Sequence, residues 1–191
     1  AEFAINELGV TRAAAIHDGD PYTEGLARVF ADSFEELGGT IVAFEAEAAD
    51  ASNVEPLLTT VAASSPELIY FPVFIPLGSL LTNTASEIPD LEGVILAGAD
   101  GIQSPSFLEN TVGTSEGMYV SGPDLSFENS FYQDEFLPAY TAAYGTDPTA
   151  PFHAHSYDAT MMVLDAVEEV AQEGSDGTLL IGRQALRDAL Y

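Results

Sequence analysis

The chain has 191 residues, 47% of them hydrophobic, and carries 31 acidic residues against four basic ones, which gives a formal net charge of −27. This length and apolar content suffice for one core, or for one core and part of a second. The negative charge argues against nucleic acid or anionic lipid as a partner, because both require clustered cations. The chain has no cysteine, which excludes disulfides, thiolate catalysis and cysteine metal sites within it.

Residues 16–42 predict a βαβ unit. An apolar strand over residues 13–16 ends at a turn of sequence HDGD, where Asp20 is placed to cap a helix and Pro21 to be its first residue. The helix is expected to end at Gly38-Gly39, before a strand over residues 40–44. Helical spacing predicts an apolar face of Leu26, Val29, Phe30, Ser33, Phe34 and Leu37.

The same alternation of strands and helices continues along the chain. A helix over residues 54–61 precedes a strand at 68–71, a helix over 77–85 precedes a strand at 94–97, and a further strand is predicted at 118–120. This order predicts an α/β fold, with a Rossmann-like parallel sheet that carries helices on both faces. Ligands of such sheets bind at the carboxyl ends of the strands, so a site is expected in the turns there.

A breaker cluster, Ser121-Gly122-Pro123, predicts a boundary between two parts of the chain. We expect residues 1–123 to form an α/β ligand-binding lobe. Residues 124–191 are predicted to be a mainly helical segment that contributes extra C-terminal helices.

The helical segment begins with an aromatic-rich helix over residues 131–144, which Gly145 is expected to close. The next helix, over residues 157–170, carries apolar side chains on much of its circumference and therefore needs cover. Residues 174–177 predict a loop, and a last helix is expected from residue 183.

The HDGD turn superficially suggests a calcium loop, because Asp18, Asp20 and Glu24 are close in sequence. An EF-hand needs an oxygen ligand at position 5, glycine at position 6 and glutamate at position 12. Counted from Asp18, those positions hold Tyr22, Thr23 and Val29. We therefore expect helix capping at this turn.

Other chemistry is weakly supported. His153 and His155 could bind a metal from one strand face, but no third ligand can be assigned and the segment is better suited to opening a helix. His17 could act as a base, yet no serine stands in a nucleophile motif, and the phosphate-binding glycine motifs are missing. We predict no metal site, no cofactor and no enzymatic activity.

Polar and aromatic residues follow three of the predicted strands, namely Tyr22, Phe74 and Asp100. A lone acid between alanine and glycine at a strand end can face a cleft and suits an ammonium group, because a charge-assisted hydrogen bond is strong where water is partly excluded. The alternative is that Asp100 only caps its turn while Tyr22 and Phe74 pack locally.

Five segments carry a family resemblance in their order along the chain, namely IHDGDPYTEGLARVFADSFEELGGTIV, LIYFPVFIPLGS, GADG, SEGMYVSGP and PFHAHSYDATMMVLDAV. The resemblance is to the type I periplasmic binding proteins of branched-chain amino acid ABC transporters, the leucine/isoleucine/valine-binding family. It implies that two α/β lobes close on a ligand, that Tyr22, Phe74 and Asp100 line the cleft, and that Asp100 holds the ligand α-ammonium. Phe152 falls where the family often has an aromatic residue that lines the side-chain pocket.

Two departures from the family pattern concern the ligand. Phe74 stands where the resemblance leads us to expect a tyrosine hydroxyl, and Asp100 is shorter than the glutamate usual in leucine-type binders. Both changes allow a ligand of different size or class, so the term branched-chain amino acid is the label of the family only.

The resemblance also implies that most of the N-terminal lobe would precede Ala1 and that returning strands would follow Tyr191. In an intact relative, residues after about Pro123 would belong to the first lobe. The chain is therefore expected to be a fragment with exposed apolar helices, and such faces tend to find partners. We predict a homodimer, exchanged through residues 121–130.

The function implied is that of an extracytoplasmic solute-binding component, which passes a small amino-acid-like ligand to an ABC permease. Its location would be periplasmic or extracellular, and the resemblance is compatible with a lipid anchor on a segment upstream. The alternative is a sensory ligand-binding domain of a receptor or regulator. Permease genes alongside would support transport, whereas a transmembrane or signalling segment downstream would support sensing.

Overall fold

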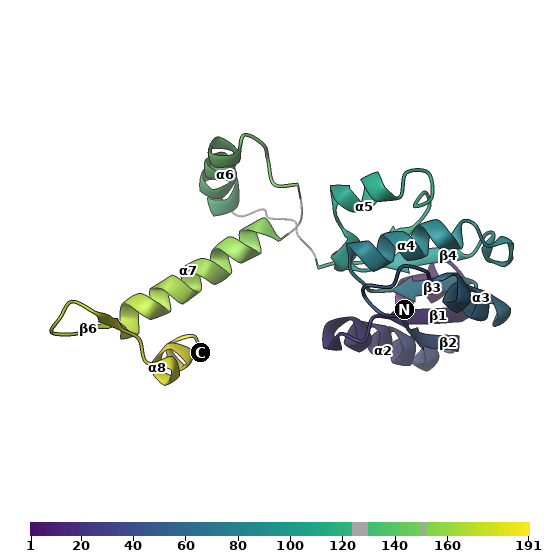
Figure 1. Cartoon of the computed structure of the whole chain (residues 1–191), viewed down its shortest axis with the longest axis horizontal. Coiled ribbons are helices and arrows are strands. Elements are labelled where there is room, and N and C mark those ends of the chain that lie inside the picture. Colours follow the sequence, from purple (N-terminus) through teal and green to yellow (C-terminus); the bar gives the residue numbers. More distant parts are fainter. Residues whose placement is uncertain (124–129, 150–151) are drawn as a thin grey trace. The chain divides into compact units, whose positions relative to one another are not determined.

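The computed structural model describes residues 1–123, 130–149 and 152–191 (Figure 1). The chain divides into two compact units, Ala1–Asp124 and Leu125–Tyr191, and each is described by itself. Among the described residues, no helix is long and apolar enough to cross a membrane.

The first unit alternates strands and helices around one parallel sheet. Its elements are α1 (Glu2–Asn6), β1 (Arg12–His17), α2 (Pro21–Glu36), β2 (Thr40–Ala46), α3 (Glu55–Ala63), β3 (Leu68–Phe71), α4 (Ile75–Ala85), η1 (Pro89–Leu91), β4 (Ile95–Gly98), η2 (Asp100–Ile102), α5 (Pro105–Asn110) and β5 (Tyr119–Val120). The strand order is β2-β1-β3-β4-β5 and every pairing is parallel. The predicted α/β fold with a parallel sheet is confirmed.

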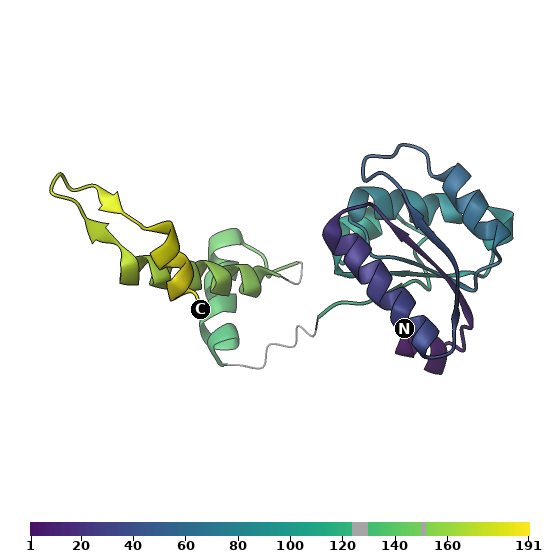
Figure 2. The same ribbon diagram turned by 90° about the horizontal axis from the view of Figure 1, so that it is seen from below.

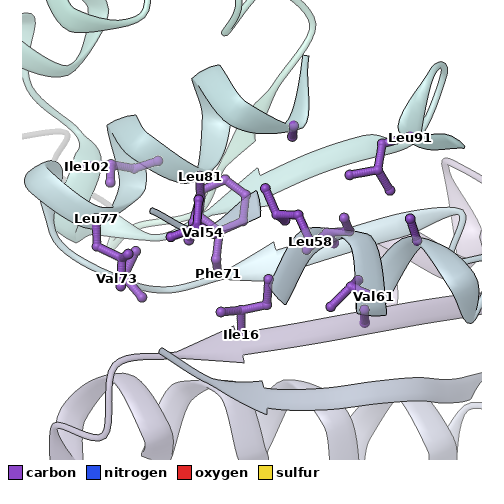
Figure 3. Packing of buried hydrophobic residues seen from close by; sticks show 14 of the residues in the cluster. Ile16, Val54, Leu58, Val61, Phe71, Val73, Leu77, Leu81, Leu91 and Ile102 are labelled. Carbon is purple, nitrogen blue, oxygen red and sulfur yellow. The ribbon is translucent and has the colours of Figure 1, made fainter. Parts of the chain in front are cut away.

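Helices cover both faces of this sheet, with α2 on one side and α4 on the other (Figure 1). Along β1, Ala14 and Ile16 pack into the larger core cluster, whereas Ala13 packs with α2 residues on the opposite face, as the period of two in a strand requires. Figure 3 shows Ile16 and Phe71 in the larger cluster together with Val54, Leu58 and Leu81.

The predicted apolar face of α2 is partly wrong. Phe34 is fully buried, but Val29 is 64% exposed and Leu37 43% exposed, and the other buried residues of the helix are Thr23, Ala27 and Ala31. Small side chains allow the helix backbone to approach the sheet closely, so the helix, which lies across the sheet in Figure 2, turns its alanines inward. The spacing of the large apolar residues alone does not reveal this rotation.

The second unit contains η3 (Tyr132–Phe136), α6 (Leu137–Tyr144), α7 (His153–Val170), β6 (Gln172–Glu173), β7 (Leu179–Leu180) and α8 (Arg183–Ala189). Gly145 closes α6 as predicted, in the left-handed conformation with φ 75°, and its N–H donates to the carbonyl of Thr141. The π turn of η3 was not predicted. It ends two residues before Pro138, which has no N–H to donate to the preceding turn.

Helix α7 carries the apolar side chains that the sequence predicts, and most of them are exposed. Its buried residues are Ala154 and Ala166, while the exposed large side chains are Tyr157, Met161, Met162, Val163 and Leu164. The predicted loop at residues 174–177 is the turn of the antiparallel hairpin β6–β7. Of the predicted exchange segment at 121–130, residues 124–129 lie outside the described residues.

Candidate functional site

The turn after β1 is held by its own side chains. His17, the last residue of β1, is buried, and its Nδ1 accepts a hydrogen bond from the N–H of Gly19 at 3.1 Å. The N–H of Asp20 donates to Asp18 Oδ1 at 3.0 Å. Gly19 has φ 82°, a conformation that glycine adopts without strain, so the chain can reverse tightly here.

Both acids of the HDGD turn stabilise the start of α2. Asp20 is the N-cap, and its carboxylate accepts the N–H of Tyr22 at 2.8 Å. The buried hydroxyl of Thr23 donates to Asp18. The capping by Asp20 confirms the sequence prediction, whereas the role of Thr23 was missed, although a hydroxyl three residues after an N-cap is a recognisable pattern.

Three of the predicted site residues meet at the carboxyl ends of β1, β3 and β4. The Tyr22 hydroxyl donates to Asp100 Oδ1 at 2.6 Å, although the two residues are 78 positions apart in the chain. The rings of Tyr22 and Phe74 stack with their centroids 6.2 Å apart. Tyr22 is 45% exposed and Phe74 49% exposed, so this cluster of Tyr22, Phe74 and Asp100, called the strand-end cluster below, is open to a ligand.

The Asp100 carboxylate, which accepts the Tyr22 hydrogen bond, changes the pKa of Tyr22. The hydrogen bond to Asp100 raises the pKa of Tyr22 to about 12, with a smaller contribution from burial. No side-chain hydrogen bond caps the 3₁₀ helix η2, which begins at Asp100. The N-cap position of η2 is Ala99, and the Asp100 carboxylate accepts its hydrogen bond from Tyr22.

A carboxylate beside two exposed aromatic rings can bind a small cation. Asp100 has a second carboxylate oxygen with acceptor capacity beyond the bond from Tyr22. An ammonium group there would combine a charge-assisted hydrogen bond with attraction to the faces of the rings. Within the described ranges, no three His, Cys, Asp or Glu side chains gather as a metal site would require.

The fourth predicted site residue, Phe152, lies in the second unit, and the structure does not place it relative to the strand-end cluster. It directly precedes α7, with its ring edge-on to His155 at 5.7 Å. Together with Phe136, Tyr140 and Tyr157 it lines an aromatic pocket of about 590 Å³ between α6 and α7. His153 and His155 lie in the first turn of α7, so the segment opens a helix as predicted.

Comparison with known proteins identifies the family. The periplasmic binding protein family matches residues 1–191. The leucine-specific-binding protein of Salmonella typhimurium is 23% identical over 192 residues, which cover 92% of this chain and 50% of that protein. The leucine-, isoleucine-, valine-, threonine- and alanine-binding protein of Pseudomonas aeruginosa is 23% identical over 159 residues, which cover 83% of this chain and 42% of that protein.

Solved structures agree on the fold. The leucine binding protein LivK of Thermotoga maritima matches with a TM-score of 0.77 and 23% identity, over 99% of this chain and 51% of that one. LivJ of Streptococcus pneumoniae, solved in complex with isoleucine, matches with a TM-score of 0.72 and 22% identity, over 99% of this chain and 51% of that one.

The chain thus spans about half the length of the relatives that it matches. These relatives are solute-binding proteins and not enzymes, and they bear out the resemblance described from the sequence. With a match that extends over all 191 residues, the chain belongs to the periplasmic binding protein family.

Proposed function

We propose that the protein is the extracytoplasmic solute-binding component of an ABC uptake system and that it binds a small amino-acid-like ligand. The observation that carries this proposal is the strand-end cluster, in which Tyr22 bonds Asp100 and stacks on Phe74. In the proposed complex, Asp100 accepts hydrogen bonds from the ligand α-ammonium while the two rings form a wall beside it. Phe152 would line the pocket for the ligand side chain, and an ABC permease would receive the ligand.

The names of the relatives support the ligand class. One relative is named for leucine, another for five amino acids including threonine and alanine, and LivJ was solved with isoleucine. All of these ligands carry an α-ammonium group. Because Asp100 has one methylene fewer than the glutamate expected from the resemblance, the ligand has more room at this end of the site.

Calorimetric titration of the full-length protein with amino acids, amides and small carboxylates tests the proposal. We expect amino acids to bind best. Asp100→Asn should lower the affinity for amino acids by about tenfold or more, because the neutral amide loses a charge-assisted hydrogen bond to the ammonium group. The matched control is Asp90→Asn, which removes one negative charge from an exposed position in η1. The proposal is wrong if ligands without an ammonium group bind best and Asp100→Asn leaves their affinity unchanged.

We also infer that the 191-residue chain forms a homodimer. The exposed apolar side chains of α7 support this inference, because large apolar side chains that are exposed together on one helix tend to find partners. A second copy of the chain offers the same surface, so the two can cover each other in an isologous contact.

A further inference from the structure

Two turns of the first unit touch at Gly101. A β-carbon built on Gly101 would lie 2.8 Å from the carbonyl oxygen of Val73, 3.1 Å from Phe74 Cδ1 and 3.4 Å from Phe74 Cε1. Real β-carbons essentially never come within 3.0 Å of another heavy atom in this way. The turn after β4 therefore approaches the turn after β3 more closely than any residue with a side chain would allow.

Lack of space, and not an unusual backbone conformation, explains glycine at this position. Gly101 is absent from the glycines with positive φ, so alanine could adopt its backbone angles. The obstacle is also difficult to move. Val73 is fully buried, and its N–H donates to the carbonyl of Phe71 at 2.8 Å, so its carbonyl oxygen cannot swing aside as the end of a long side chain would.

Gly101 completes a closed ring of contacts through the strand-end cluster. It is covalently bonded to Asp100 and packs against Phe74. Phe74 stacks on Tyr22, whose hydroxyl returns to Asp100 at 2.6 Å. A β-carbon at Gly101 would push Asp100 and Phe74 apart, so one position controls how closely all three cluster residues approach one another.

We propose that Gly101 is a positioning residue of the ligand site, whose missing side chain sets the separation between the carboxylate of Asp100 and the ring of Phe74. This inference rests on the proposed function. Gly78 and Gly98 also lack space for a side chain, but the nearest atom to a β-carbon there belongs to the buried side chain of Ile102. They serve the packing of the core, whereas Gly101 faces the site.

The test compares Gly101→Ala with Gly39→Ala in the full-length protein, titrated with each of the twenty standard amino acids by calorimetry. Gly39 is the matched control, because a β-carbon there would also be crowded, at 2.3 Å from the Phe34 ring. Gly39 directly precedes β2 and therefore lies at the amino end of the sheet, away from the strand-end cluster. We expect Gly101→Ala to lower the affinity for amino acids by about tenfold. Gly39→Ala should lower the free energy of unfolding and leave this affinity unchanged.

Two further measurements separate positioning from general damage. In an Asp100→Asn background, Gly101→Ala should have no additional effect on affinity, because its effect acts through that carboxylate. In protein labelled with fluorotyrosine and free of ligand, the ¹⁹F signal assigned to Tyr22 by Tyr22→Phe should shift in Gly101→Ala and stay in place in Gly39→Ala. Additive losses of affinity, or an unmoved Tyr22 signal, would overturn the positioning role.

A second pair of variants leaves Gly101 unchanged and covers the case in which Gly101→Ala does not fold. Phe74→Ala removes the ring whose distance from the Asp100 carboxylate Gly101 sets. If that distance governs binding, the double variant Phe74→Ala with Asp100→Asn should lower affinity by less than the product of the two single fold-changes. Independent effects of the two substitutions would contradict the proposal. If the wild type binds no amino acid, the proposed function is wrong and the positioning role falls with it; if the wild type binds and Gly101→Ala binds equally, only the positioning role is wrong.

Discussion

Tyr22 joins two distant turns through a single hydroxyl group. Its O–H donates to Asp100, and the resulting bond favours the protonated tyrosine, which is why its pKa rises to about 12 from an ordinary value of 10.0. The Tyr22 ring also stacks on the ring of Phe74. One exposed side chain therefore contacts both other members of the strand-end cluster and links the ends of β3 and β4.

The raised pKa of Tyr22 predicts a loss of stability at alkaline pH. A group whose pKa is higher in the folded state than in the unfolded state stabilises the fold fully below the unfolded value. The contribution of Tyr22 should therefore be complete below about pH 10 and disappear as the pH rises to about 12. Urea unfolding measured across this range should show a smaller pH-dependent loss for Tyr22→Phe than for the wild type.

Tyr119→Phe is the control for this titration, since among the described residues the Tyr119 side chain makes a ring contact with Phe3 and no hydrogen bond. The free energy of unfolding of Tyr119→Phe should change with pH as that of the wild type does. Identical pH profiles for Tyr22→Phe and the wild type would show that the bond to Asp100 does not contribute to stability.

At the scale of single elements, the start of α2 shows how a turn and a helix stabilise each other. Asp20 caps the helix and Pro21 occupies its first position. The carboxylate of Asp18 accepts a hydrogen bond from the hydroxyl of Thr23, in the first turn of the helix. The turn thereby orients the helix that carries Tyr22. The geometry of the strand-end cluster depends on this local network as well as on the sheet.

Removal of the cap should weaken the first unit by a predictable amount. Asp20→Ala loses the acceptor for the Tyr22 N–H, and we expect the free energy of unfolding to fall by about 1 kcal/mol. Asp32→Ala, at an exposed position later in the same helix, should leave stability unchanged or raise it slightly, because alanine favours the helix interior. Equal effects of the two variants in urea unfolding would exclude a specific capping role.

At the scale of the whole molecule, exposed apolar surface and high negative charge act in opposite directions. Helix α7 exposes Met161, Met162 and Leu164, which favours association of two chains. A net charge of −27 on each chain opposes it, and dissolved salt screens that repulsion.

The balance between these effects predicts a dimer that salt strengthens. Light scattering of the 191-residue chain should give twice the monomer mass, with tighter association at higher ionic strength. Met161→Gln with Leu164→Gln should shift the chain toward monomer, whereas Val29→Gln, an exposed change in the first unit, should not. A monomer at every salt concentration, without binding of an apolar dye, would contradict the predicted homodimer.

The strands and the convergence of Tyr22, Phe74 and Asp100 could be predicted from local pattern and topology. Residues 68–71 are an uninterrupted apolar run, and the structure has β3 at the same residues. Tyr22, Phe74 and Asp100 each follow a predicted strand, and the carboxyl ends of parallel strands lie at one edge of a sheet. Short elements such as α5 and the hairpin β6–β7 were missed, because they are too brief to develop a periodic signal.

The sequence by itself determined the α/β class, the cap at Asp20, the end of α6 at Gly145 and the family, since each depends on local chemistry or on an ordered set of segments. Only the tertiary structure decided which face of α2 is buried, that Asp100 bonds Tyr22, and why residue 101 is glycine. These features depend on contacts between elements far apart in the chain. The physical reason is that close packing depends on distances between backbones, which no local pattern of residues contains.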